Sequence, residues 1–156
     1  MKSMHSLHSH SRVFALLASF ALPFVAAQAR PVTAERIIAA DQEPQNWLAH
    51  GRTYGEQRYS PLKQVNDGNV GQLGLAWSYA TGTTRGLQAT PIIVDGRMYA
   101  TGVWSVVYAL DAKTGTKLWQ YEHRLPDGIM PCCDVVNRGA ALYGNLVIFG
   151  TLDAQL

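Results

Sequence analysis

The chain has 156 residues, which is enough for one ordinary domain, and 47 % of them are hydrophobic. Its 13 Lys and Arg residues include Lys2 and Arg12, whereas all 11 Asp and Glu residues follow residue 29, so the chain after that point is close to neutral. No run of basic residues with interleaved aromatic residues is present, which argues against a nucleic-acid-binding protein. His50 and His123, the histidines that follow residue 29, are too far apart to suggest a metal site.

Residues 1–29 have the three parts of a secretory leader. A start that carries Lys2 and Arg12 precedes an apolar run at 13–27, and Ala-Gln-Ala at 27–29 fits a small-x-small cleavage site. The alternative is a membrane anchor, but the run is short for a bilayer and no charge cluster follows it. We therefore expect a signal peptide that is cleaved after Ala29, and no membrane association of the mature chain.

Residues 30–46 are expected to form a polar lead-in, poorly ordered at first, that ends in the start of a short helix. Asp41 can cap this helix and Gly51 can end it, which places the helix over residues 41–50. A further helical turn is expected within residues 65–73.

From residue 74 onwards the pattern changes to short β-type runs that are separated by glycine turns. Asp95-Gly96 and Tyr143-Gly144-Asn145 are typical of hairpin turns. The expected strands are residues 75–80, 90–94, 97–101, 106–111, 117–122, 140–143 and 146–151.

These strands repeat along the chain. A shift of about 48 residues places Gly96 on Gly144 and Met98 on Leu146, so the order of turn, strand and glycine recurs. A repeat of 40 to 50 residues with several strands in each unit is typical of a β-propeller.

A tryptophan motif gives a second sign of the same repeat. Asp111 is followed by Thr-Gly at 114–115 and then by Trp119, and Asn69 and Trp77 have the same spacing without the Thr-Gly. Asp and Thr-Gly favour a tight turn between two strands, and the tryptophan offers a flat surface that can pack between adjacent sheets.

Two blades cannot close a propeller, because an open pair exposes apolar faces and unpaired sheet edges. We therefore expect an all-β fold that consists of the first two or so blades of a longer propeller, over residues 47–156. The chain is interpreted as an amino-terminal fragment.

Cys132 and Cys133 are the only two cysteines in the sequence, and they are adjacent. They could be two reduced thiols, two thiols that reach other chains, or one disulfide between neighbours. A disulfide normally joins Cα atoms about 4.4 to 6.8 Å apart, whereas neighbouring Cα atoms are about 3.8 Å apart, so the closed ring would strain the backbone. The residues alone leave all three possibilities open.

Four stretches carry a resemblance to a known family. They are residues 51–62 (GRTYGEQRYSPL), 86–91 (GLQATP), 109–119 (ALDAKTGTKLW) and 132–139 (CCDVVNRG). From residue 47 to its end the chain resembles the start of the periplasmic quinoprotein alcohol dehydrogenases, whose cofactor is pyrroloquinoline quinone. The last stretch is the most specific, because noncatalytic propellers also use tryptophan motifs.

The resemblance implies an eight-bladed propeller with the quinone in a central pocket. Cys132 and Cys133 match the cysteines that form a ring disulfide flat against the cofactor, and Arg138 matches the arginine that binds a cofactor carboxylate. Gln88 occupies a cofactor-lining position at which family members commonly carry glutamate. An amide keeps the hydrogen bonds of that position but lacks its charge.

The implied activity is the periplasmic oxidation of a small primary alcohol to an aldehyde, with a calcium or lanthanide ion on the quinone. Electrons would pass to a cytochrome c or a similar acceptor, and some family members carry a haem c domain at the carboxyl end. The catalytic base and metal ligands are expected beyond Leu156, so the fragment alone should be inactive.

Two other functions fit part of the pattern. A quinoprotein that oxidises sugars, polyols or polymeric alcohols would use the same cofactor. A noncatalytic propeller scaffold in the envelope would share the repeats, but it would not need Cys132, Cys133 or Arg138.

Overall fold

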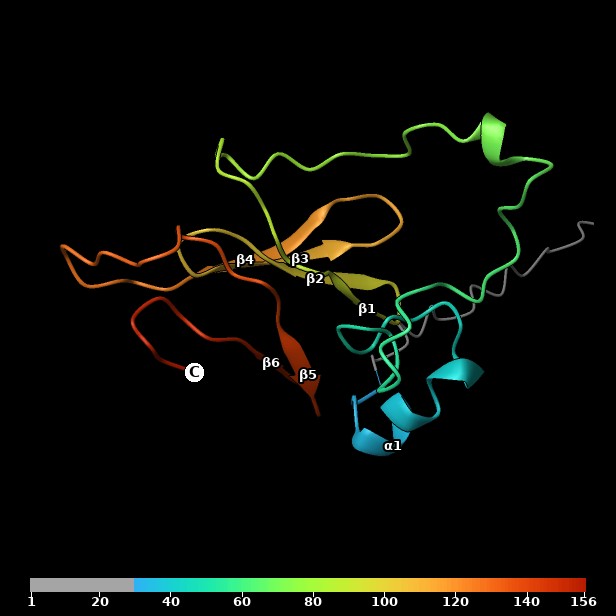
Figure 1. Cartoon of the computed structure of the whole chain (residues 1–156), viewed down its shortest axis with the longest axis horizontal. Helices are drawn as coiled ribbons and strands as arrows, with labels where there is room; N and C mark the ends of the chain where they lie inside the picture. The colour runs from blue at the N-terminus through green and yellow to red at the C-terminus, as the bar shows by residue number, and fades with distance from the viewer. Residues whose placement is uncertain (1–29) are drawn as a thin grey trace, which may run out of the picture.

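The computed structural model describes residues 30–156, so the expected leader lies outside the described residues (Figure 1). Within residues 30–156, no helix is long and apolar enough to cross a membrane. The helical elements are α1 (Ala34–Ile38) and the 3-10 turns η1 (Ala40–Gln42) and η2 (Val70–Gln72). The strands are β1 (Ile92–Val94), β2 (Arg97–Thr101), β3 (Val106–Asp111), β4 (Lys117–Glu122), β5 (Ala141–Tyr143) and β6 (Leu146–Ile148).

Strands β1 to β4 form one antiparallel sheet in chain order (Figure 1). Val94 pairs with Arg97 across the first turn, and the two turn residues Asp95 and Gly96 have φ angles of 47° and 77°. A two-residue turn with two positive φ angles matches the right-handed twist of its strands, and a glycine in it avoids steric cost. The predicted Asp-Gly hairpin is confirmed.

Strands β5 and β6 form a separate hairpin, which pairs Tyr143 with Leu146 around Gly144. This hairpin follows the β1–β2 hairpin at the predicted spacing, with Gly144 in the place of Gly96. The repeat is therefore structural: one four-stranded antiparallel unit is followed by the beginning of a second unit. Strands β1 and β6 are shorter than predicted: β1 begins at Ile92 rather than at residue 90, and β6 ends at Ile148 rather than at residue 151.

The strand expected over residues 75–80 is wrong. These residues are held by side chains instead: Trp77 donates its indole N–H to the carbonyl oxygen of Ala112 (3.2 Å), and the hydroxyl of Tyr79 donates to Gln120 (3.4 Å). The sequence pattern detects an extended segment, but a strand also needs a backbone partner, and this segment has none within residues 30–156.

Trp77 docks on the turn between β3 and β4. Gly115 has a φ angle of 72°, and a Cβ atom at this position would lie 2.4 Å from Cε3 of Trp77. The carboxylate of Asp111 shapes the same turn by accepting the backbone N–H of Thr114 (2.8 Å) and its hydroxyl (2.9 Å). The tight turn predicted from Asp111 and Thr-Gly is therefore present, and it receives the tryptophan of the preceding copy of the motif.

The helix expected over residues 41–50 is also wrong. The α-helix lies earlier, at α1, where Thr33 accepts the backbone N–H of Arg36 (3.2 Å) as its N-cap. Trp47 instead pairs with Ile93, and the two residues exchange backbone hydrogen bonds of 2.7 and 2.9 Å. The edge strand β1 offers free backbone groups to Trp47, and this pairing prevails over the local capping signals near Asp41.

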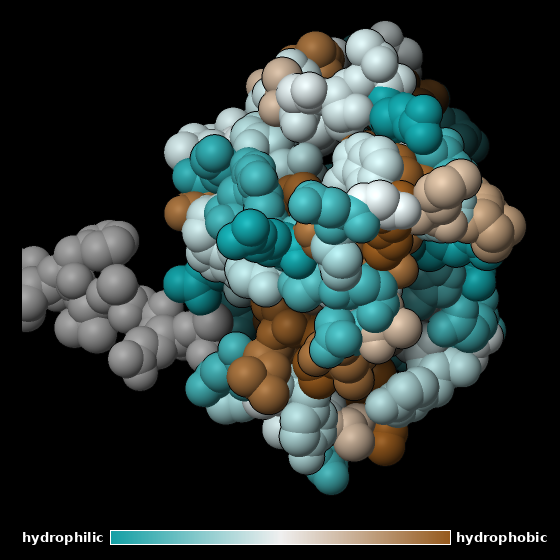
Figure 2. Space-filling view, turned by 90° about the vertical axis from the view of Figure 1, so that its left-hand side faces the viewer, coloured by the Kyte–Doolittle hydropathy of each residue, from teal (hydrophilic) through white to brown (hydrophobic). Residues whose placement is uncertain are grey.

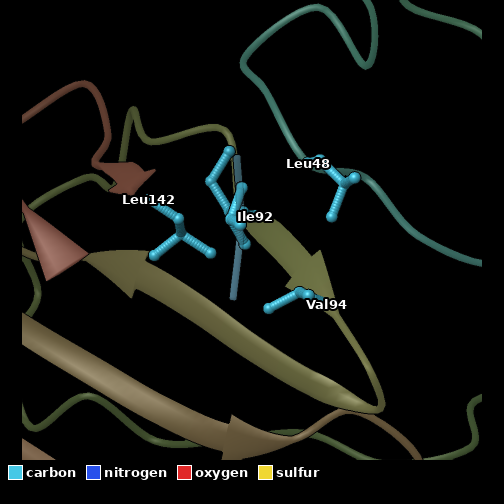
Figure 3. Packing of buried hydrophobic residues seen from close by; sticks show 5 residues of the cluster. Leu48, Ile92, Val94 and Leu142 are labelled. Atoms are coloured by element: carbon cyan, nitrogen blue, oxygen red, sulfur yellow. The ribbon is translucent and has the colours of Figure 1, made fainter. Parts of the chain in front are cut away.

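The core lies between the amino-terminal segment and the two hairpins. Val32 and Leu48 come from that segment, Ile92 and Val94 from β1, and Leu142 from β5, and each side chain is less than 9 % exposed (Figure 3). Residues 30–46 are therefore an ordered part of the fold, which corrects the expectation of a poorly ordered lead-in.

A partly buried charge cluster connects this segment to the β1–β2 turn. The guanidinium of Arg36, only 8 % exposed, contacts Glu43 at 2.7 Å and Asp95 at 2.6 Å. The hydrogen bond from Arg36, helped by one from Asn46, holds the pKa of Glu43 below its ordinary value even though burial acts in the opposite direction. The carboxylates are thus stabilised in their charged form.

Other apolar side chains stay uncovered. Figure 2 shows hydrophobic area between polar residues on one face of the molecule. Trp119 on β4 is 41 % exposed and Leu146 on β6 is 64 % exposed. Together with Tyr121 and Phe149 they line a groove of about 530 Å³ between the two sheets.

Candidate functional site

The adjacent cysteines lie in the connection between β4 and β5. Both are exposed, and in this structure both are free thiols. Asp134 closes the turn behind them, because its backbone N–H donates to the carbonyl oxygen of Cys132 (3.1 Å). Asp134 adopts a φ angle of 77°, a conformation that Asp tolerates better than most residues.

Arg138 acts electrostatically on the second of these cysteines, Cys133. The hydrogen bond with Cys132 is the main cause that raises the pKa of the Cys133 thiol, and the charge of Arg138 acts in the opposite direction. The charge of Arg138 thus partly offsets the effect of Cys132 on the pKa of Cys133.

The segment that carries the cysteines is anchored from behind. Val135 is 3 % exposed, and its carbonyl oxygen accepts the backbone N–H of Trp104 (2.9 Å). Asn137 fixes the following bend, since its side chain accepts the N–H of Gly139 (2.9 Å) and donates to the carbonyl oxygen of Gly150 (2.7 Å). Asn137 therefore shapes the loop that leads from the cysteines to β5.

The structure brings the segment of Gln88 beside the cysteine segment. The backbone N–H of Thr90 donates to the carbonyl oxygen of Arg138 (3.4 Å), and Arg85 forms an ion pair with Asp134 at 2.6 Å. Gln88 lies between these two links in the sequence, and its side chain is exposed. Sequence reasoning missed Arg85, because an isolated arginine in a polar loop carries no local signal of its partner.

Arg138 also lines an open hollow of about 760 Å³. The rest of the lining comes from His50, Leu156 and residues 136–141 and 148–152. Gln88, Cys132 and Cys133 are not among the lining residues. The predicted site residues therefore occupy neighbouring segments, without sharing this hollow.

The donor set fits an anionic, planar group better than a metal. Arg138 is exposed, and within residues 30–156 its guanidinium takes part in no ion pair or side-chain hydrogen bond. No group of three or more His, Cys, Asp or Glu residues that could hold a metal ion occurs in this described part of the chain. A fixed charge without a partner suits the carboxylates of a quinone cofactor.

Comparison with known proteins defines the class. Residues 47–156 match the family model described as "PQQ: Glucose/ethanol/alcohol dehydrogenase, beta-propeller domain". The chain belongs to this family of dehydrogenase β-propellers, which confirms the family and the all-β propeller fold expected from the sequence.

Several relatives are similar to the same part of the chain. It is 58 % identical over 130 residues to the quinohemoprotein alcohol dehydrogenase ADH-IIG of Pseudomonas putida, covering 80 % of this chain and 18 % of that protein. It is 54 % identical over 143 residues to a quinoprotein ethanol dehydrogenase of the same species, covering 90 % and 23 %. The chain thus spans about a fifth of the length of these relatives.

Solved structures agree with this likeness. The structure of ADHIIG from Pseudomonas putida HK5 superposes with a TM-score of 0.74 at 55 % identity, covering 80 % of this chain and 19 % of that one. A europium-containing methanol dehydrogenase superposes with a TM-score of 0.68 at 37 % identity, covering 75 % and 21 %.

Proposed function

We propose that this chain contributes part of the cofactor site of an enzyme that oxidises primary alcohols to aldehydes with pyrroloquinoline quinone. The observation that carries the proposal is the exposed guanidinium of Arg138, which has no partner within residues 30–156 and follows two adjacent cysteines by five positions. Relatives that are named quinoprotein ethanol dehydrogenase and quinohemoprotein alcohol dehydrogenase support the same activity.

Each residue of the site has a distinct role in the proposal. Arg138 binds a carboxylate of the cofactor with its charged planar fork. Cys132 and Cys133, free thiols in this structure, give up two electrons and two protons to a thiol oxidant of the periplasm and close into a ring disulfide, which presents a flat, apolar surface to the cofactor. Gln88 lines the site with an amide that can both donate and accept hydrogen bonds. When bound, the quinone supplies a two-electron acceptor for the alcohol.

The remaining parts of the reaction require residues other than those placed here. A calcium or lanthanide ion, the base that takes the hydroxyl proton and a cytochrome c acceptor belong to the whole enzyme in the periplasm. The europium in one structural relative is consistent with a lanthanide. Residues 30–156 alone are therefore expected to show no turnover.

The test measures dye-linked alcohol oxidation by the protein expressed with all of the reading frame that continues past Leu156. Ethanol and glucose are compared, each with and without added pyrroloquinoline quinone and calcium. Ethanol oxidation that requires the quinone supports the proposal. Quinone-dependent oxidation of glucose alone would assign the enzyme to sugars, whereas a folded protein that binds no quinone would support a noncatalytic scaffold.

A further inference from the structure

Arg85 connects the two segments that carry the proposed cofactor ligands. Its guanidinium donates to Oδ1 of Asp134 at 2.6 Å, although the two residues lie 49 positions apart. Asp134 directly follows Cys132 and Cys133, and Arg85 lies three residues before Gln88. One contact thus spans from the glutamine segment to the cysteine turn.

A second link fixes the relative direction of these segments. Thr90 donates its N–H to the carbonyl oxygen of Arg138, and a Cβ atom at Gly139 would lie 3.6 Å from the carbonyl oxygen of Thr90. The Arg85–Asp134 contact comes first in both segments and the Thr90–Arg138 contact follows, so the segments run in the same direction. Gln88 is therefore held between two fixed points.

Asp134 transmits the contact to the cysteines. The same Oδ1 that meets Arg85 also accepts the backbone N–H of Val135 (2.7 Å), while the N–H of Asp134 donates to Cys132. A carboxylate that shifts away from Arg85 must alter one of these hydrogen bonds. The left-handed backbone of Asp134 makes this turn sensitive to such a change.

We propose that Arg85 is a positioning residue that sets the cysteine turn and Gln88 in register for the cofactor. The proposal rests on the proposed function, because it assigns the cofactor that the two segments receive. The ion pair is half-exposed, with side-chain exposures of 52 % and 45 %, so its removal changes stability little. An effect on the site is therefore separable from unfolding.

The test uses the full-length protein in four variants. Arg85→Ala removes the contact, whereas Arg85→Lys keeps the charge and a donor, and a single donor is enough to replace the one nitrogen, Nη2, that contacts Asp134. Asp134→Asn keeps the acceptor for Val135 and loses the charge. Arg58→Ala is the matched control: it breaks an equally exposed ion pair, with Glu56 at 3.2 Å, that involves no residue of the cysteine turn.

Two measurements are made on each variant: the Kd for pyrroloquinoline quinone, and the thiol–disulfide equilibrium of Cys132 and Cys133 against dithiothreitol. In the second, the protein disulfide is reduced to two thiols as dithiothreitol is oxidised to its cyclic disulfide. Arg85→Ala and Asp134→Asn are expected to raise the Kd and shift the equilibrium by about threefold to fivefold each. Arg85→Lys should stay within about twofold of the wild type, and the control should not differ from it.

The outcomes separate this proposal from the proposed function. Normal quinone binding and a normal thiol equilibrium in Arg85→Ala would overturn the role of Arg85, while quinone binding by the wild type would still support the function. If the wild type binds no quinone, the function fails, and the cofactor role of Arg85 fails with it. The thiol equilibrium then shows separately whether Arg85 holds the cysteine turn.

Discussion

Replacing Gly115 by alanine tests the docking of Trp77 on the β3–β4 turn. Two costs are expected. An alanine at a φ angle of 72° lies in the left-handed region, which costs about 1–2 kcal/mol. Its Cβ atom would also lie 2.4 Å from the Trp77 ring, and relief of such overpacking costs about 1–3 kcal/mol more.

Gly82→Ala provides the matched control. Gly82 has nearly the same φ angle, 76°, but no heavy atom lies within 4 Å of its added Cβ. This variant therefore carries the backbone cost alone. The difference between the two variants, about 1–3 kcal/mol, isolates the tryptophan contact.

The assay is urea unfolding of the full-length protein, followed by tryptophan fluorescence and circular dichroism. Gly115→Ala should have the lower midpoint, and adding Trp77→Leu to Gly115→Ala should recover part of the steric cost. Equal midpoints for Gly115→Ala and Gly82→Ala would refute the reasoning, because the ring would then not constrain the turn.

Four further changes test the site and the charge cluster. Arg138→Ala should weaken quinone binding by about 1–3 kcal/mol, and an unchanged cofactor titration would contradict its role. Cys132→Ser with Cys133→Ser should leave the circular dichroism spectrum intact and impair quinone-dependent turnover, whereas Gln88→Glu should change cofactor retention if the amide lies at the quinone. Glu43 has a lowered pKa in the fold, so its contribution to stability is present above its ordinary pKa of 4.5 and is lost as the pH falls through the lower folded value. Glu43→Gln should remove this part of the acid sensitivity, and identical acid unfolding curves for wild type and variant would exclude it.

The sequence predicts best those features that depend on neighbouring residues. Asp95-Gly96 specifies its hairpin because two positive φ angles are a local requirement, and Asp111 with Thr-Gly specifies the β3–β4 turn in the same way. The prediction of secondary structure fails where a residue distant in the sequence determines the local conformation. Trp47 leaves the expected helix because the edge of β1 offers Ile93 as a backbone partner.

The candidate site shows the same difference between residues with a local sequence signal and residues whose role depends on a distant partner. Cys132, Cys133 and Arg138 stand out because adjacent cysteines followed by a fixed charge form a rare local pattern. Arg85 belongs to no such local pattern, because its ion-pair partner, Asp134, lies 49 positions away in the sequence. The sequence therefore locates the groups proposed to touch the cofactor more readily than those that align them.

The amino-terminal segment also determines where the folded unit begins. The family model matches from residue 47, yet Val32 pairs with Gly144 and packs in the core. A truncated variant that starts at Trp47 would lack residues 30–46, including Val32, and would expose the apolar surface of Ile92 and Leu142. Such a protein would be prone to aggregate, so a boundary chosen from family likeness alone would cut through the folded unit rather than beside it.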